Sequence, residues 1–411
     1  MPNDKPENKH RDHRDLGQEM DLFSFHEIAP GAPFWHPKGM IIVKELEKFI
    51  RKLQDDHGYQ EISTPIMVKK DVFEKSGHWE HFRDSMFWFK NPIDENETLA
   101  IKPMNCPEST YVFSSTIRSY KDLPLRLAEI GRLHRNELSG TLGGLLRVRQ
   151  MTMDDAHIYC RFDQIKEELT SVLKMTEEFY KRLGLKVTYS IGTRPEKAMG
   201  EKKTWDEAEK ILEESLKSLG LKFEIMKGEG AFYGPKIHFD IKDSQNRTWT
   251  IATAQIDFQI PERFDVFYMD ENGEKVRPVI IHRAIFGSFE RFIGILLEHF
   301  DGALPFWLSP VQVQVLTIND KVLDYAKKIT AELKSNRPEA GQPWAGNIRV
   351  SLDERNESIG KKIREAEMQK IPYILVIGEK EAEAGKVAVR ERGKGDIGVM
   401  SVEEFLKITA K

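Results

Sequence analysis

The chain has 411 residues, of which 40% are hydrophobic and 31% charged, and its formal net charge is −4. These values are typical of a globular protein with two or three domains, and they exclude a polycation that binds nucleic acid through overall charge. Its two cysteines, Cys106 and Cys160, exclude a disulfide scaffold and indicate the reducing cytoplasm. We expect no membrane partner, because no apolar run is long enough to span a bilayer and the first residues are charged.

The first three quarters of the sequence predict helices gathered around an antiparallel sheet. Apolar residues at helical spacing predict helices at 40–56, 163–183 and 204–219. Strand-like segments are expected at 61–63, 186–191, 221–226, 236–242, 248–258 and 264–269. Short turn sequences such as DSQN and DENGE separate several of these segments, which favours antiparallel pairing. The fold class is therefore α+β.

The pattern changes near residue 306, where strands and helices begin to alternate. Strands are predicted at 311–318, 348–353, 373–378 and 386–392, and helices at 320–333, 357–370 and from Ser401. This alternation predicts a small, mostly parallel α/β sheet covered on both faces, with an exposed loop at 336–347. We therefore expect a polar tail at 1–15, a first domain at 16–306 and a second at 307–411.

One stretch, RLAEIGRLHRNELSGTLGGLLRVRQMTMDDAHIYC at 126–160, carries a pattern that suggests chemistry. Alternation places Arg135 and Glu137 on one face of a strand, and the following loop carries Arg147 and Arg149. Guanidinium groups arranged in this way can hold a triphosphate. A solvated basic turn would have the same composition, so the residues alone leave both interpretations open.

The same stretch resembles motif 2 of the class II aminoacyl-tRNA synthetases in its threonyl form. Six further segments resemble the threonyl-tRNA synthetase family and occur in the family's order: DHRDLGQEMDLFSFHEIAPGAPFWHPKG, STPIMVKKDVFEKSGHWEHF, KPMNCP, FYGPKI, AQIDFQIP and IHRAIFGSFERFIG. The chain is thus identified as a member of this family, in the form without the N-terminal editing region. The resemblance implies activation of L-threonine with ATP to threonyl-adenylate and transfer to threonine tRNA.

The resemblance also implies one Zn²⁺ per chain, held by Cys106, His157 and His282. These residues lie far apart without a local zinc spacing, so the pattern alone favours ordinary core or surface residues. Three protein ligands would leave a coordination position for the amino group and hydroxyl of threonine. Valine lacks that hydroxyl and should be rejected.

Further roles follow by position in the family's motifs. The implied catalytic residues are Arg135, Arg147 and Arg291, and ATP, with Mg²⁺, would contact Arg135, Glu137, Met151 and Arg291. Threonine would contact Met104, Asp155, Tyr233 and Gln255. A packed aromatic residue is the alternative for Tyr233.

The second domain resembles the family's anticodon-binding domain, in RNESIGKKIREAEMQKIPY and GEKEAEAGKVAVRER. Asn356, Glu381 and Arg390 fall where that domain contacts anticodon bases, although a solvated charged face is the alternative. The family further implies a homodimer through the motif 1 region, which the segment STPIMVKKDVFEKSGHWEHF at 63–82 resembles. A separate trans-editing protein is expected, because serine differs from threonine by one methyl group.

Several positions depart from the family's pattern. Glu108 and Ser109 replace a Gly-His pair, Gly143 replaces a histidine, and Gln150 and Met151 replace Gly-Phe. In addition, Met153 and Thr250 each replace a glutamine. These changes leave two alternatives open: a synthetase-like paralogue that loads a carrier other than tRNA, and a non-catalytic RNA-binding protein.

Overall fold

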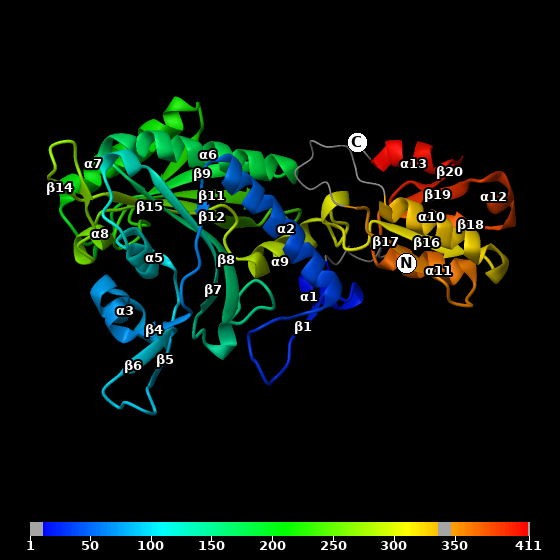
Figure 1. The fold of residues 1–411 in the computed structure, drawn as a ribbon, viewed down its shortest axis with the longest axis horizontal. Coiled ribbons are helices and arrows are strands. Elements are labelled where there is room, and N and C mark those ends of the chain that lie inside the picture. The colour runs from blue at the N-terminus through cyan, green and yellow to red at the C-terminus, as the bar shows by residue number, and fades with distance from the viewer. Residues whose placement is uncertain (1–10, 336–346, 410–411) are drawn as a thin grey trace, which may run out of the picture. The chain divides into compact units, whose positions relative to one another are not determined.

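The computed structural model describes residues 11–335 and 347–409. By internal packing the chain divides into two units (Figure 1). One contains Phe25–Pro33 and Ile50–Gly294, and the other contains Ile295 to the C-terminus together with Phe34–Phe49 and the segment that ends at Ser24.

The first unit is built on an eight-stranded sheet with the order β10-β9-β11-β12-β15-β8-β7-β3. Its strands in that order are Phe223–Met226, Val187–Gly192, Lys236–Lys242, Thr248–Asp257, Val279–Ala284, Gln150–Cys160, Leu125–His134 and Gln60–Glu61. Every neighbouring pair is antiparallel except the parallel pairs at the two ends, β10 with β9 and β3 with β7. The predicted α+β class is confirmed.

Two long helices cover this sheet and confirm the predicted helical periodicity. These are α6 (Ile165–Arg182) and α7 (Lys202–Ser218), which contact each other and lie against strands of the sheet (Figure 1). In α6 the buried side chains include Leu169, Val172 and Leu173, which recur at helical spacing. The prediction of a strand at 264–269 is mostly wrong. It contains only the two-residue strand β13 (Tyr268–Met269), because the short helix α8 (Gln259–Arg263) carries the chain out of the sheet.

A smaller sheet, with the order β4-β6-β5, precedes the motif 2 stretch. Its strands are Met67–Lys69, Thr98–Ile101 and Phe87–Lys90, and the adjacent helices are α3 (Lys70–Ser76), α4 (His78–Phe82) and α5 (Cys106–Phe113). The remaining elements up to residue 300 are α1 (His13–Glu19), β1 (Phe23–Ser24), β2 (Phe34–Trp35), α2 (Pro37–Asp56), β14 (Lys275–Val276) and α9 (Phe289–His299).

A buried ion pair ties the middle of the eight-stranded sheet together. Arg283 donates to Asp154 Oδ1 at 2.6 Å, and both side chains have no solvent exposure. The other oxygen of Asp154 accepts from the backbone N–H groups of Ile285 at 2.7 Å and Phe286 at 3.2 Å. Asp154 on β8 therefore fixes both the end of β15 and the turn that follows it.

The C-terminal sheet has the order β17-β16-β18-β19-β20. Its strands in that order are Val350–Asp353, Val313–Thr317, Tyr373–Ile377, Val387–Glu391 and Gly395–Met400, and its helices are α10 (Leu323–Ser335), α11 (Ile359–Met368), α12 (Glu379–Ala384) and α13 (Val402–Thr409). The expected mostly parallel sheet is wrong, because β19 and β20 are antiparallel to their neighbours. The link between β18 and β19 is too short for a parallel crossover, which takes a dozen or more residues.

Near the N-terminus, the expected polar tail at 1–15 is corrected at its last residues. Asp12 caps α1 through its side chain, and His13 is buried, with its Nδ1 2.6 Å from Glu298 Oε1. Residues 13–15 are thus helical. The exposed loop predicted at 336–347 lies, apart from its last residue, outside the described residues. Within residues 11–335 and 347–409, every helix is too short or too polar to span a lipid bilayer.

Gly234 allows a close backbone crossing between the FYGPKI segment and β12. A Cβ atom at this position would lie 1.7 Å from the carbonyl oxygen of Ile256. We expect Gly234→Ala to lower the free energy of unfolding by about 1–3 kcal/mol, because the backbone must shift to relieve the overlap. Denaturant unfolding measures this change. The control is Gly360→Ala, where a Cβ meets nothing within 4 Å and which should be neutral or stabilising. Equal stability of the two variants would contradict the prediction.

Candidate active site

Strand pairing brings the three expected metal ligands together. His157 of β8 lies directly opposite His282 of β15, and their ring centroids are 5.0 Å apart. Cys106, the first residue of α5, completes the group, and one ligand atom from each residue lies within 4.8 Å of the others. All three residues are buried. The geometry thus assembles one sulfur and two nitrogen donors, a set that suits Zn²⁺.

The surroundings of this Cys-His-His cluster also fit a metal. Asp257 Oδ2 lies 2.9 Å from His282 Nε2, which leaves Nδ1 of the same ring for a cation. Burial lowers the pKa of His157 well below its usual value, so this ring is neutral, as a metal ligand must be. Burial also raises the pKa of the Cys106 thiol, so a bound dication is what would hold it as a thiolate.

The side chains expected to contact threonine border the cluster. Gln255 of β12 pairs with His282, and Tyr233 donates its hydroxyl hydrogen to Gln255 Oε1 at 2.5 Å. Asp155 precedes His157 by two residues and therefore shares its face of β8. Asn105 donates to Asp155 at 3.1 Å, and burial raises the pKa of the Asp155 carboxyl to about 6.

Met104 lies among apolar side chains near the Cys-His-His cluster. Its side chain packs against the hydrophobic cluster that contains Cys106, Phe113 and Tyr159. The structure therefore places Met104 beside a metal-ligand candidate, with apolar contacts around it. Together these positions place polar groups beside the cluster and apolar contacts around Met104.

The residues expected to bind ATP line a cavity of about 180 Å³. Its lining includes all five expected side chains, Arg135, Glu137, Arg147, Met151 and Arg291. The prediction that Arg135 and Glu137 lie within a strand is wrong, because β7 ends at His134 and both residues lie in the segment that follows. The short loop still directs them into the cavity.

Positive charge accumulates in this cavity. Burial lowers the pKa of the Arg135 guanidinium, and burial together with Arg147 lowers the pKa of Arg291. Guanidinium groups nevertheless keep their charge in proteins, so three cations share a confined space. Glu137 partly offsets them by accepting from Arg147 Nε at 3.0 Å. A polyanion would complete the balance of charge.

The two sites are neighbours. Met153 of β8 and Thr253 of β12 line the cavity, and Asp155 and Gln255 follow them by two residues on the same faces of these strands. A carboxylate bound near Asp155 and a phosphate bound by Arg135 could therefore meet. Such an arrangement suits attack of a carboxylate oxygen on phosphorus, a step that depends on positioning and on electrostatic stabilisation.

Met151 and Ser109 show how the departures from the family's pattern are accommodated. Met151 is 7% exposed, packs against Val148 and Leu133, and contributes to the cavity wall. Ser109 lies within hydrogen-bond distance of the Tyr159 hydroxyl, at 2.7 Å, and donates to the Cys106 carbonyl at 2.9 Å. Nothing in the structure explains Glu108, whose buried carboxyl has no hydrogen-bond partner among the described residues.

The expected anticodon residues occupy separate positions in the C-terminal unit. Asn356 lies in the exposed loop between β17 and α11. Glu381 accepts from the backbone N–H of Gly378 at 3.0 Å and so caps its own helix, α12. Arg390 pairs with Ile374 near the start of β18, and its guanidinium lies 3.5 Å from Glu367.

Three site residues were not singled out by the sequence reasoning: His78, Asn105 and Asp257. His78 is buried, and its Nε2 lies 3.8 Å from Cys106 Sγ. Burial lowers the pKa of His78 to about 4, so its ring is neutral near pH 7. All three lie inside segments that carried the family resemblance. Attention to every polar residue of those segments would have found them.

Comparisons with known proteins match this arrangement. The tRNA synthetase class II core domain (G, H, P, S and T) matches residues 87–300, and the anticodon binding domain matches residues 312–411. The chain is 52% identical to the threonine–tRNA ligase of Clostridium botulinum (strain Langeland) over 98% of its own length and 61% of that relative. Identity to the Clostridium tetani threonine–tRNA ligase is 50%, over 97% of this chain and 61% of that relative. The chain thus spans about three fifths of the length of these curated relatives.

Comparisons with solved structures give the same result as the sequence comparisons. The RNA-binding domain of the threonyl-tRNA synthetase from Cryptosporidium parvum superposes with a TM-score of 0.87 at 39% identity, over 97% of both chains. A putative threonyl-tRNA synthetase from Aeropyrum pernix gives a TM-score of 0.83 at 27% identity, over 97% of this chain and 95% of that one. With its two domain matches and its similarity along nearly the whole length, the chain belongs to the class II tRNA synthetases, in the threonyl-tRNA synthetase family.

Proposed function

We propose that the protein is a threonine–tRNA ligase, which activates L-threonine with ATP and transfers it to threonine tRNA. The observation that carries this proposal is the adjacency of two built sites. An arginine-lined cavity suited to a polyanion shares strands β8 and β12 with the polar side chains beside the Cys-His-His cluster. A non-catalytic RNA-binding protein would not need both sites.

In the proposed first step, the threonine carboxylate attacks the α-phosphate of ATP and pyrophosphate leaves. Arg135 holds the α-phosphate and the charge that develops on it, and Arg291 holds the γ-phosphate, with Arg147 beside them. Glu137 accepts from the adenine amino group, and Met151 covers the ring. Mg²⁺ accompanies the triphosphate. The protein therefore contributes orientation and fixed charge to this step, without a covalent intermediate.

In the amino-acid pocket, Asp155 accepts hydrogen bonds from the threonine amino group or hydroxyl, and Tyr233 and Gln255 close the wall. Cys106, His157 and His282 would hold Zn²⁺, which when bound supplies a Lewis-acid position for the same two groups. Valine leaves that position and Asp155 unpaired, so it is rejected strongly. Serine keeps the hydroxyl and loses one methyl group, so a separate editing activity, such as a trans-acting protein, is expected to clear seryl-tRNA.

We expect ATP–pyrophosphate exchange with threonine, weaker exchange with serine and none with valine. Lost burial of one methyl permits roughly tenfold to two-hundredfold discrimination against serine. Exchange assays with all twenty amino acids, followed by charging of threonine tRNA, measure this. Exchange without charging would favour a carrier other than tRNA, and absence of both activities would favour the non-catalytic alternative.

We expect one zinc ion per chain, and we expect His157→Ala to lose it, because two remaining ligands hold zinc poorly. Elemental analysis of the purified protein measures the zinc content directly and does not depend on activity. His134→Ala is the matched control, since His134 is half-buried and contacts Gln150 away from the cluster. Full zinc occupancy in the His157 variant would contradict the assignment of His157 as a zinc ligand.

We also propose a cytoplasmic homodimer that forms through the motif 1 region. In its support, Ile66, Met67, Trp88 and Phe89 on and beside the small sheet are each at least 39% exposed. An interface between identical subunits would bury such apolar side chains twice. Light scattering should therefore give twice the chain mass of 47.6 kDa. Met67→Lys should weaken the dimer, whereas Ile225→Lys, at a similarly exposed site on β10, should not. A monomer that remains active at micromolar concentration would contradict this proposal.

A further inference from the structure

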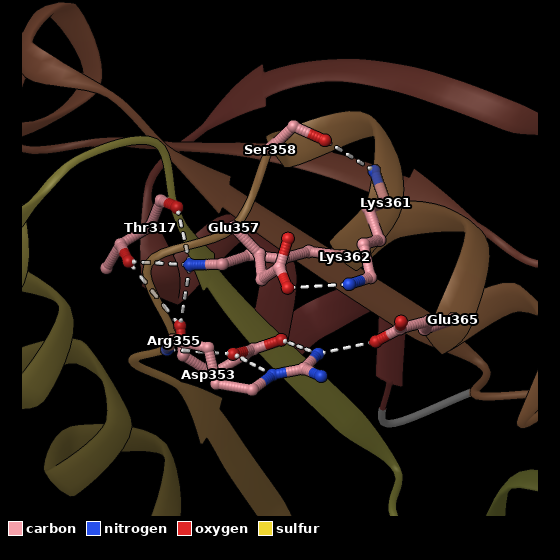
Figure 2. A network of polar contacts seen from close by, with 8 residues as sticks. All are labelled: Thr317, Asp353, Arg355, Glu357, Ser358, Lys361, Lys362 and Glu365. Carbon is pink, nitrogen blue, oxygen red and sulfur yellow. Dashed lines mark hydrogen bonds and ion pairs between the residues drawn. The ribbon is translucent and has the colours of Figure 1, made fainter.

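Lys362 is a charged side chain buried in the C-terminal unit, with only 2% exposure. It projects from α11 towards the ends of the parallel strands β16 and β17 (Figure 2). Its ammonium group donates to the carbonyl and hydroxyl oxygens of Thr317 at 3.1 and 3.3 Å, and to the carbonyl of Asp353 at 3.2 Å. Thr317 and Asp353 are the last residues of these two strands. Lys362 therefore ties both strand ends to the helix.

The bonds of Lys362 are unusual for a buried cation. All three acceptors are neutral oxygens, whereas buried charges are ordinarily paired with an opposite charge. The carboxylate of Asp353 is instead engaged by Arg355, with distances of 2.9 Å from Nε and 2.6 Å from Nη2. An apolar side chain could fill the same space without the cost of burying a charge. These bonds therefore indicate that Lys362 is present because it holds the two strand ends in place.

The same network fixes the loop that follows β17. Arg355 also reaches Glu365 of α11 at 2.6 Å, and its backbone N–H donates to Asp353 at 3.0 Å (Figure 2). The next residue, Asn356, is exposed, and its side chain makes no hydrogen bond within residues 11–335 and 347–409. The loop therefore presents one exposed amide, next to Arg355, at the carboxyl edge of the parallel strands. That edge is where α/β sheets bind their ligands.

We propose that Lys362 is a positioning residue for reading the anticodon: it sets the loop that carries Asn356 against single-stranded bases of tRNA. This inference rests on the proposed function. An amide can both donate to and accept from a base edge, and it discriminates between bases only if its position is fixed. Lys362 supplies the fixed position by holding Asp353 and Thr317, while Arg355 and Glu365 hold the loop itself.

The test compares two neutral substitutions at neighbouring positions, Lys362→Met and Lys361→Met. Lys361 lies next to Lys362 on α11, but its side chain is 41% exposed and pairs with Glu357 at 2.6 Å (Figure 2). Both variants remove one positive charge from the same helix, so the net charge that attracts phosphates changes equally. Only Lys362→Met releases the two strand ends.

The readout is charging of threonine tRNA with its own anticodon and with one substituted anticodon base. At a temperature where circular dichroism shows both variants folded, we expect Lys362→Met to raise the KM for tRNA roughly tenfold and to lose most discrimination between the two tRNAs. The kcat of threonine activation should stay unchanged, because that step needs no tRNA. Lys361→Met should keep both the KM within roughly twofold and the discrimination.

Equal behaviour of the two variants would overturn the inference and show that Lys362 serves stability alone. If the unaltered protein does not charge tRNA, or does not discriminate between anticodons, the result contradicts the proposed function on which this inference rests. Should Lys362→Met fail to fold, Thr317→Val removes one acceptor of the ammonium group and keeps the side-chain shape. It should shift the discrimination in the same direction by a smaller factor, and unchanged discrimination in that variant would also overturn the inference.

Discussion

The buried pair of Asp154 and Arg283 is the constraint on which the active site depends. Because side chains alternate along strands, these two lie on the face of β8 and β15 opposite to Asp155, His157 and His282. A slip by one residue would move the whole site to the other face of the sheet. Removing one partner of such a pair costs about 3–5 kcal/mol, because it leaves the other charge buried and alone. The pair, on one face of the sheet, therefore fixes the strand register that the site on the opposite face requires.

Buried charges at element junctions recur elsewhere in the molecule. Lys102 is 1% exposed, donates to Glu129 at 2.9 Å, and also donates to the hydroxyl of Thr64 at 2.8 Å. In this way it joins the strand that precedes KPMNCP to the segment beyond β3. Ion pairs of this kind add little net stability compared with apolar packing, but they tolerate few alternative geometries. Such ion pairs therefore suit a protein whose separate motifs must stay in one arrangement.

Local pattern was enough for much of the fold, and its failures have physical causes. The apolar periodicity of α6 and α7 and the composition of β11 predicted these elements closely. The mixed direction of the C-terminal sheet escaped prediction, because strand direction depends on the length of the connection and not on the strand's own residues. For the site, the pairing of His157 with His282 is a long-range event that no local spacing encodes. The family resemblance supplied that information. Asp257 and Asn105 lie in the same matched segments, but only the structure shows which groups they contact.

The contact between Glu137 and Arg147 gives the nucleotide cavity a counter-ion of its own. In the structure this carboxylate screens part of the repulsion among the arginines. Under the proposed function, the phosphates of ATP would take over that screening, and Glu137 would be free to accept from the adenine amino group. Because Glu137 stays in the cavity, binding of ATP would add negative charge to it. After pyrophosphate and AMP leave, the contact of Glu137 with Arg147 would form again.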